Sequence, residues 1–267
     1  MRSASPALVF FGRAGYAAKG IVYIVIGVLA ARAAFGRGGQ ATDTKGALGV
    51  IGDGPFGTVA LALIAAGLLG YMAWRLVAAI TDAEGEGNKP TKLVVRAAQA
   101  GRGLLYGALG LQAIRFLQGR GGGEGSAPED WSARLLQLPY GRFLVGAAGL
   151  GMIGYAIYQL YRASSDKKVR KHLDLGYAGH TQATWIVRLG KFGIAARAVV
   201  FGMIGVLLIR AARESDPSEA GGIGQSLREL ANGDNGQIVF PIVAIGLAAY
   251  GVYQIATARY RRMRAVG

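Results

Sequence analysis

The chain has 267 residues, of which 52% are hydrophobic and 17% are charged, and it contains no cysteine. Because a soluble domain carries roughly 25% charged residues, this composition indicates an integral membrane protein. The lack of cysteine excludes disulfides, thiolate metal sites and a cysteine nucleophile.

The first predicted helix, residues 13–32, carries a cation followed one helical turn later by an aromatic residue. The motif is Lys-Gly-Ile-Val-Tyr at 19–23, and it returns as Arg-Gly-Leu-Leu-Tyr at 102–106 and as Arg-Ala-Val-Val-Phe at 197–201. A helix over residues 13–32 covers about 28 Å, close to the ~30 Å hydrocarbon layer of a bilayer. Each motif cation therefore lies inside the membrane boundary, where it either extends outward to the interface or faces protein or water.

The second predicted helix of each repeat contains no formal charge and carries a Gly-x-x-x-Tyr-x-x-aromatic pattern. These helices are predicted at 56–74, 143–161 and 238–258, each long enough to cross a bilayer. Together the two patterns define tandem two-helix repeats at 9–82, 92–165 and 187–260. We therefore predict an all-α integral membrane protein with six transmembrane helices and pseudo-threefold symmetry.

Amphipathic segments lie between the two helices of each repeat. Ile51, Leu135 and Leu230 occupy equivalent positions in these segments. We expect short surface helices at the outer membrane interface.

The formal net charge of +15 is distributed unevenly along the chain. The two termini and the two linkers between repeats hold 20 of the 30 Lys and Arg but 5 of the 15 Asp and Glu, whereas the loops inside the repeats hold 10 of each. The densest clusters are the basic linker 163–187 and the basic tail 259–267. The positive-inside rule places this side, with both termini, in the cytoplasm. We expect it to contact anionic membrane lipids, and we expect no nucleic-acid partner.

The motif cations and their aromatic neighbours form the first candidate site. Each pair lies one turn apart, so the two side chains share a helix face. Three pairs around an axis would present three cations to an anion, a carboxylate or a lipid phosphate. The alternative is a cation that extends to the interface beside an interfacial aromatic residue. The candidate anion- or lipid-binding residues are Lys19, Arg102, Arg197, Tyr23, Tyr106 and Phe201.

The recurring face of the second helices forms the second candidate site, which either lines a polar vestibule or hydrogen bonds to a neighbouring helix. Its members are Arg75, Gln159, Gln254, Tyr71, Tyr155 and Tyr250. A third recurring set of cations comprises Arg32, Arg115 and Arg210. Thirteen residues of helix rotate this set about 140° away from the motif cations, so we expect the outer arginines to be membrane anchors.

The chemistry of the predicted spans argues against an enzyme. Both histidines, His172 and His180, fall in the basic linker, and the central spans contain no Asp or Glu. We therefore expect no metal, no haem, no other cofactor and no carboxylate proton relay.

The motifs at 13–23 and in the second helices resemble those of a bacterial membrane family, the domain-of-unknown-function family numbered 1206. The resemblance covers nearly the whole chain and implies a multi-pass protein of the bacterial cytoplasmic (inner) membrane, without a known activity. Because intramembrane polar residues are few, we expect a non-catalytic accessory or scaffold subunit that packs against another membrane protein or forms a homo-oligomer. The alternative is a membrane-embedded binding or permeation module for an anionic small molecule or lipid.

Overall fold

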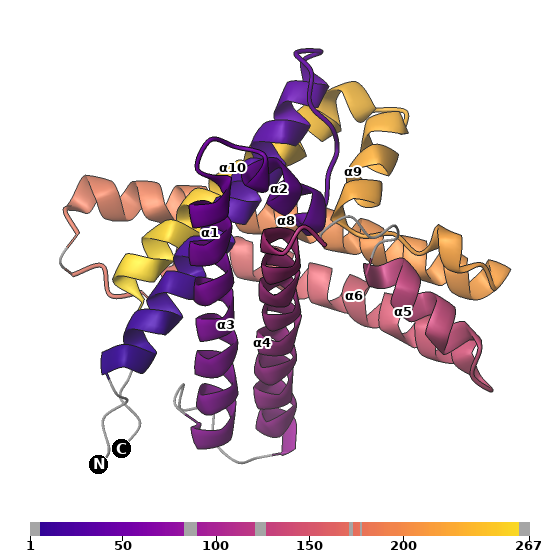
Figure 1. Cartoon of the computed structure of the whole chain (residues 1–267), viewed down its shortest axis with the longest axis horizontal. Helices are drawn as coiled ribbons and strands as arrows, with labels where there is room; N and C mark the ends of the chain where they lie inside the picture. The colour runs from indigo at the N-terminus through magenta and orange to yellow at the C-terminus, as the bar shows by residue number, and fades with distance from the viewer. Residues whose placement is uncertain (1–5, 83–89, 121–126, 171–172, 177, 262–267) are drawn as a thin grey trace.

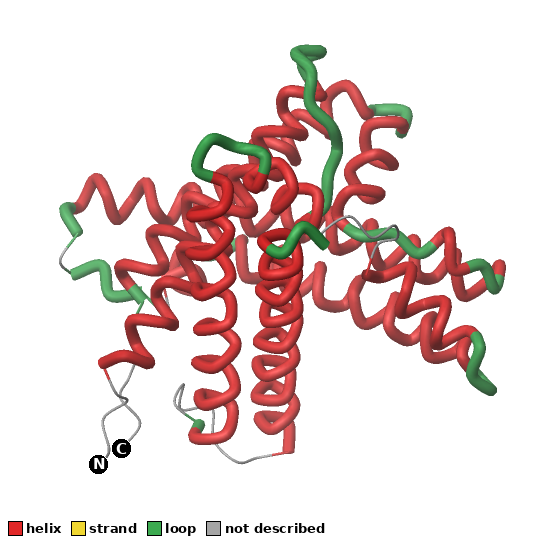
Figure 2. The backbone as a smooth tube through the Cα atoms, in the orientation of Figure 1, coloured by secondary structure: helices red, strands yellow, loops and turns green. Residues whose placement is uncertain are grey.

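The computed structural model describes residues 6–82, 90–120, 127–170, 173–176 and 178–261, and this part of the chain is dominated by helices joined by short loops (Figure 2). The prediction of an all-α protein is confirmed. The six long helices are α1 (Pro6–Ala34), α3 (Gly57–Thr81), α4 (Pro90–Leu117), α6 (Gly141–Ala163), α8 (His180–Glu214) and α10 (Gly236–Tyr260).

Short helices precede the second long helix of each repeat, as expected from the amphipathic segments. They are α2 (Thr44–Gly52), α5 (Ala127–Leu136) and α9 (Ile223–Asn232). The Asp43 side chain caps α2 by accepting a hydrogen bond of 2.8 Å from the Gly46 N–H. Two further short elements are α7 (Asp166–Arg170) and the 3₁₀ helix η1 (Pro217–Glu219).

Five helices of the described chain are long and apolar enough to cross a membrane, namely α1, α3, α6, α8 and α10. The chain is therefore a multi-pass membrane protein. The sequence predicted six such helices, and α4 is the exception. Its 28 residues include Lys92, Arg96, Arg102 and Arg115, and these cations lower its hydropathy below that of the other five.

The long helices form three antiparallel pairs, and each pair joins helices of two different repeats: α1 with α10, α3 with α4, and α6 with α8 (Figure 1). The pairs are splayed relative to one another and meet through contacts of α1 with α3 and of α8 with α10. The helices thus follow the spatial order α4, α3, α1, α10, α8, α6. Within the described residues, α4 and α6 do not pack along their length. The two long helices of the first and of the third repeat therefore pack against each other, whereas those of the second repeat do not pack along their described length.

Glycines allow the paired helices to touch through their backbones. A Cβ added at Gly251 of α10 would lie 2.5 Å from the carbonyl oxygen of Gly20 on α1. On the α6–α8 pair, a Cβ at Gly205 would lie 2.8 Å from the carbonyl oxygen of Gly149. Small residues at such crossings are typical of helix packing inside membranes, where close van der Waals contact replaces the hydrophobic effect.

Candidate functional site

A cavity of about 50 Å³ lies where all six long helices converge. Its wall contains six cationic side chains, which are Lys19, Arg75, Arg102, Arg162, Arg197 and Arg261. Tyrosines and uncharged polar groups complete most of the wall: Tyr16, Tyr71, Tyr155, Tyr250, Tyr253, Gln159, Gln254 and Thr257. No Asp or Glu lines the cavity among the residues that the structure describes.

The two candidate sites from the sequence meet in this one cavity. All three motif cations line it, and so do all six members of the second set. The two sets lie at the same depth because α1 and α3 run in opposite directions, so Lys19, midway along α1, lies level with Arg75, in the last third of α3. The aromatic members of the first set are not part of the wall. Instead, Tyr23, Tyr106 and Phe201 lie against the cations.

The expected pairing of each cation with the ring one turn later holds for one motif only. The Arg197 guanidinium carbon lies 4.0 Å from the centre of the Phe201 ring. Lys19 instead crosses to α4, where its Nζ is 4.4 Å from the centre of the Tyr106 ring. Arg102 crosses to α6, with its guanidinium carbon 5.5 Å from the centre of the Tyr155 ring. The prediction considered one helix at a time, whereas long cationic side chains reach the rings of neighbouring helices.

Tyrosine hydroxyls orient two of the cavity arginines. Arg75 donates hydrogen bonds to the hydroxyls of Tyr71 at 2.9 Å and Tyr16 at 2.7 Å. Arg197 donates through Nε to the hydroxyl of Tyr23 at 3.1 Å. Arg75 thus lines the cavity and also bonds to Tyr16 of the neighbouring helix α1.

Burial makes these cations costly in free energy. Lys19 and Arg197 are each only 6% exposed, and the Lys19 ammonium makes no hydrogen bond to any described residue. Removing a cation from water costs several kcal/mol even after relaxation. Each desolvated cation–π contact with a tyrosine ring offsets about 2 kcal/mol or more of that cost. The tyrosines therefore position the cations without neutralising them. The cavity keeps a positive potential that suits an anion.

Sequence reasoning missed three cavity residues that a face-by-face search along the helices would have found. Arg162 lies seven residues after Tyr155 on the same face of α6, and Arg261 follows Tyr250 by eleven residues. Tyr16 lies one turn before Lys19 but has no counterpart in the other repeats, so a search for repeated residues passed over it.

The outer arginines are separate from the cavity. Arg32, Arg115 and Arg210 are all exposed, as the helical rotation predicts. Their role as membrane anchors stays a prediction.

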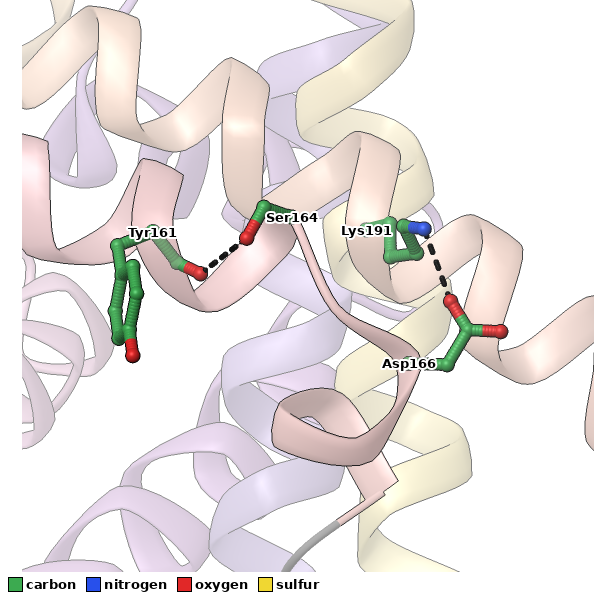
Figure 3. Close-up of polar contacts among 4 residues, drawn as sticks. All are labelled: Tyr161, Ser164, Asp166 and Lys191. Atoms are coloured by element: carbon green, nitrogen blue, oxygen red, sulfur yellow. Dashed lines mark hydrogen bonds and ion pairs between the residues drawn. The ribbon is translucent and has the colours of Figure 1, made fainter.

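The basic linker forms α7 and the first turns of α8. In Figure 3, Lys191 lies 2.9 Å from the Asp166 carboxylate, and the Ser164 hydroxyl donates to the Tyr161 carbonyl at 2.8 Å. The hydrogen bond from Lys191 lowers the pKa of the Asp166 carboxyl group. Of the clustered basic residues predicted here, Lys171, His172 and the tail 262–267 lie outside the described residues.

The linker also covers one end of the cavity. Leu173 belongs to the cavity wall and forms a backbone bridge with Arg261. The neighbouring Asp174 N–H donates to the Tyr260 carbonyl at 2.6 Å, and the Tyr253 hydroxyl donates to the Val169 carbonyl at 3.4 Å. These contacts attach the linker to the end of α10.

The arrangement of repeated helices around a cationic cavity defines a class of multi-pass helical membrane protein built from three two-helix units. The chain belongs to the family described as Domain of Unknown Function (DUF1206), which matches it at residues 14–82, 97–166 and 192–261. It is similar to "Uncharacterized protein YxxB" of Bacillus subtilis (strain 168), with 36% identity over 253 residues that cover 95% of this chain and 91% of the relative. No solved structure matches the chain.

Proposed function

We propose that this protein is a non-catalytic membrane protein that binds a small phosphate-bearing anion in its central cavity. One observation carries the proposal: six cations and no carboxylate line the cavity among the described residues. Structural cations inside a membrane protein normally pair with acidic groups or carbonyls. An anion from outside the chain would bring negative charge into the cavity and would accept the hydrogen bonds that Lys19 does not make within the described protein.

The size of the cavity limits the ligand. One water molecule needs roughly 10–15 Å³ of such space, so about 50 Å³ accommodates a few waters or one group of similar size, such as phosphate. Drug-sized organic ligands occupy pockets of roughly 300–1,000 Å³. The ligand that fits is therefore an inorganic oxyanion or the phosphate of a larger molecule whose remainder lies outside the cavity.

The charge distribution supports a specific topology for this function. We propose that α4 crosses the membrane as the sixth helix, since it is 28 residues long and packs antiparallel against α3 along its length. Six crossings put both termini on one side. The positive-inside rule makes that side cytoplasmic, in a bacterial cytoplasmic (inner) membrane. The cavity then lies in the cytoplasmic half, and the linker and tail face anionic lipid headgroups.

The test compares two triple variants that remove the same charge. Lys19→Gln/Arg102→Gln/Arg197→Gln changes the cavity, and Arg32→Gln/Arg115→Gln/Arg210→Gln changes the exposed outer set. Binding of inorganic phosphate is measured by isothermal titration on purified protein whose helix content is checked by circular dichroism. We expect the cavity variant to lose at least tenfold in affinity and the outer variant to match the wild type. Equal affinity in a correctly folded cavity variant would refute the proposal.

The surface of α6 favours a second candidate function, an accessory or scaffold subunit. In its most apolar window, α6 is 22% buried, against 50–56% for the other four apolar long helices. Such a helix has room for another membrane protein or for a second copy of the chain. Chemical cross-linking in native membranes tests this function, and a chain that stays uncross-linked at all its exposed positions would argue against it.

A further inference from the structure

The second repeat is open where the other two are closed. In the first repeat, a Cβ added at Gly67 of α3 would lie 3.0 Å from the Ala18 Cβ of α1, and in the third repeat a Cβ added at Gly246 of α10 would lie closer still to the Ala196 Cβ of α8. The corresponding pair in the second repeat is Gly101 on α4 and Gly151 on α6, and a Cβ at either would have nothing within 4 Å. The contact between the two helices of a repeat is therefore present in the first and third repeats and missing in the second.

Side-chain burial identifies the faces that the opening leaves uncovered. On the first helices, Val22 and Val200 are each 1% exposed, whereas the equivalent Leu105 of α4 is 72% exposed. On the second helices, Trp74 is 2% exposed, whereas the equivalent Tyr158 of α6 is 55% exposed. Both faces are thus largely apolar, and they flank what is here named the α4–α6 opening, bordered by Gly101, Leu105, Gly151 and Tyr158.

The α4–α6 opening leads to the cationic cavity. Arg102 of α4 and Tyr155 of α6 line the cavity and meet across the opening in the cation–π contact of 5.5 Å. Every other neighbouring pair of long helices around the cavity is packed. The linker, through Leu173, covers the cavity end beside α10. A ligand that approaches between α4 and α6 therefore meets the Arg102–Tyr155 contact, whereas elsewhere it meets packed helices or the linker.

We propose that the α4–α6 opening is a lateral portal through which the phosphate headgroup of an anionic phospholipid enters the cavity from the bilayer. This inference rests on the proposed function and names the source of its anion. The phosphate contacts Lys19, Arg102 and Arg197, while the acyl chains remain in the membrane against Leu105 and the exposed face of α6. Because Gly101 and Gly151 have no Cβ, the portal can close by the contact that the first and third repeats make.

A disulfide tests the portal, since the chain has no cysteine of its own. In a second repeat closed like the first, where the Gly67–Ala18 separation is 3.0 Å, the Cβ atoms of Gly101→Cys/Gly151→Cys would come within reach of a disulfide, whose Cβ atoms lie ~3.8 Å apart. Purified protein is oxidised or kept reduced, exposed to phosphatidylglycerol vesicles, and analysed by native mass spectrometry for bound lipid. Inorganic phosphate binding is measured in parallel. Gly101→Cys alone is the control for oxidation.

We expect oxidation to lower phosphatidylglycerol uptake at least tenfold, to leave phosphate binding no weaker than in the reduced form, and to be reversed by reduction. Equal lipid uptake in the oxidised and reduced forms would overturn the portal, while phosphate binding still lost in the cavity triple variant would leave the proposed function intact. A disulfide between two chains would identify the opening as an interface between copies and would also overturn the portal.

A second variant keeps the test decisive if the disulfide does not form. Gly151→Trp places a large side chain in the opening without requiring closure, and Ala66→Trp adds the same side chain at an exposed position of α3. We expect lower lipid uptake for Gly151→Trp only. Unchanged uptake in Gly151→Trp would overturn the portal.

Discussion

Replacing Lys19 with methionine should stabilise the ligand-free protein while weakening its response to phosphate. Methionine has a similar length and no charge, so the variant removes one buried cation and its repulsion with the other five cations of the cavity. The desolvation cost of a buried ammonium is several kcal/mol, and the contacts that offset it are the rings of Tyr106 at 4.4 Å, Tyr250 at 5.5 Å and, at the limit of the cation–π range, Tyr71 at 6.0 Å. Cation–π contacts return about 2 kcal/mol when desolvated. The net gain for Lys19→Met is therefore about 1–3 kcal/mol.

The assay is thermal unfolding of the protein in detergent, followed by tryptophan fluorescence with and without phosphate. The gain should raise the melting temperature by roughly 2–4 °C per kcal/mol. Phosphate at one hundred times its dissociation constant stabilises the wild type by about 2.7 kcal/mol, and a tenfold loss of affinity reduces this to about 1.4 kcal/mol. The exposed Lys167→Met serves as a control and should change neither quantity. A destabilised Lys19→Met protein that keeps its full phosphate response would refute the reasoning.

Three further predictions follow from the packing and the linker. Gly251→Ala should destabilise the protein by about 1–3 kcal/mol because its Cβ would meet the backbone of α1. Gly151→Ala faces open space and should stabilise α6 by about 0.4–1 kcal/mol. Denaturant titration of both variants measures the two changes in the free energy of unfolding. Trp74→Ala should cost about 3–5 kcal/mol and the equivalent, exposed Tyr158→Ala less than about 1 kcal/mol, measured in the same way. Because the pKa of Asp166 is lowered in the folded protein, its ion pair stabilises the fold fully above the unfolded pKa of about 3.9, and this stabilisation is lost as the pH falls through the lower folded pKa. Between about pH 5 and pH 3, the melting temperature of the wild type should therefore fall more than that of Asp166→Asn.

The helices and four of the six cavity cations could be predicted because repetition adds information to a single sequence. A lone Lys19 inside a span has several explanations, but the same cation in three equivalent helices indicates a shared position, and the structure brings all three to one cavity. Periodicity also identified the face of Tyr71 and Arg75. Residue spacing alone was thus enough to predict that the cavity residues include cations and tyrosines.

The departures from the prediction arise where tertiary packing separates equivalent residues. Repeated sequence implied equal packing, yet Trp74 is buried and Tyr158 is exposed, because α6 packs against α8 and not against α4. The residues at the contact itself do not reveal the difference, since Gly101 and Gly151 preserve the small residues of the closed contact. Likewise, the ring that Lys19 contacts belongs to α4, and single-helix geometry cannot reveal a partner on another helix.

The cavity charge should control whether the second repeat closes. Lipid tails are as apolar as the exposed faces of α4 and α6, so closure gains little from the hydrophobic effect and depends on helix packing and electrostatics. Closure would bring Arg102 nearer to Arg162 and Arg197, and a bound phosphate offsets that repulsion. Disulfide formation in Gly101→Cys/Gly151→Cys, followed on non-reducing gels, should therefore be several-fold faster with saturating phosphate than with chloride at equal ionic strength. An equal or slower rate with phosphate would show that charge repulsion does not hold the repeat open.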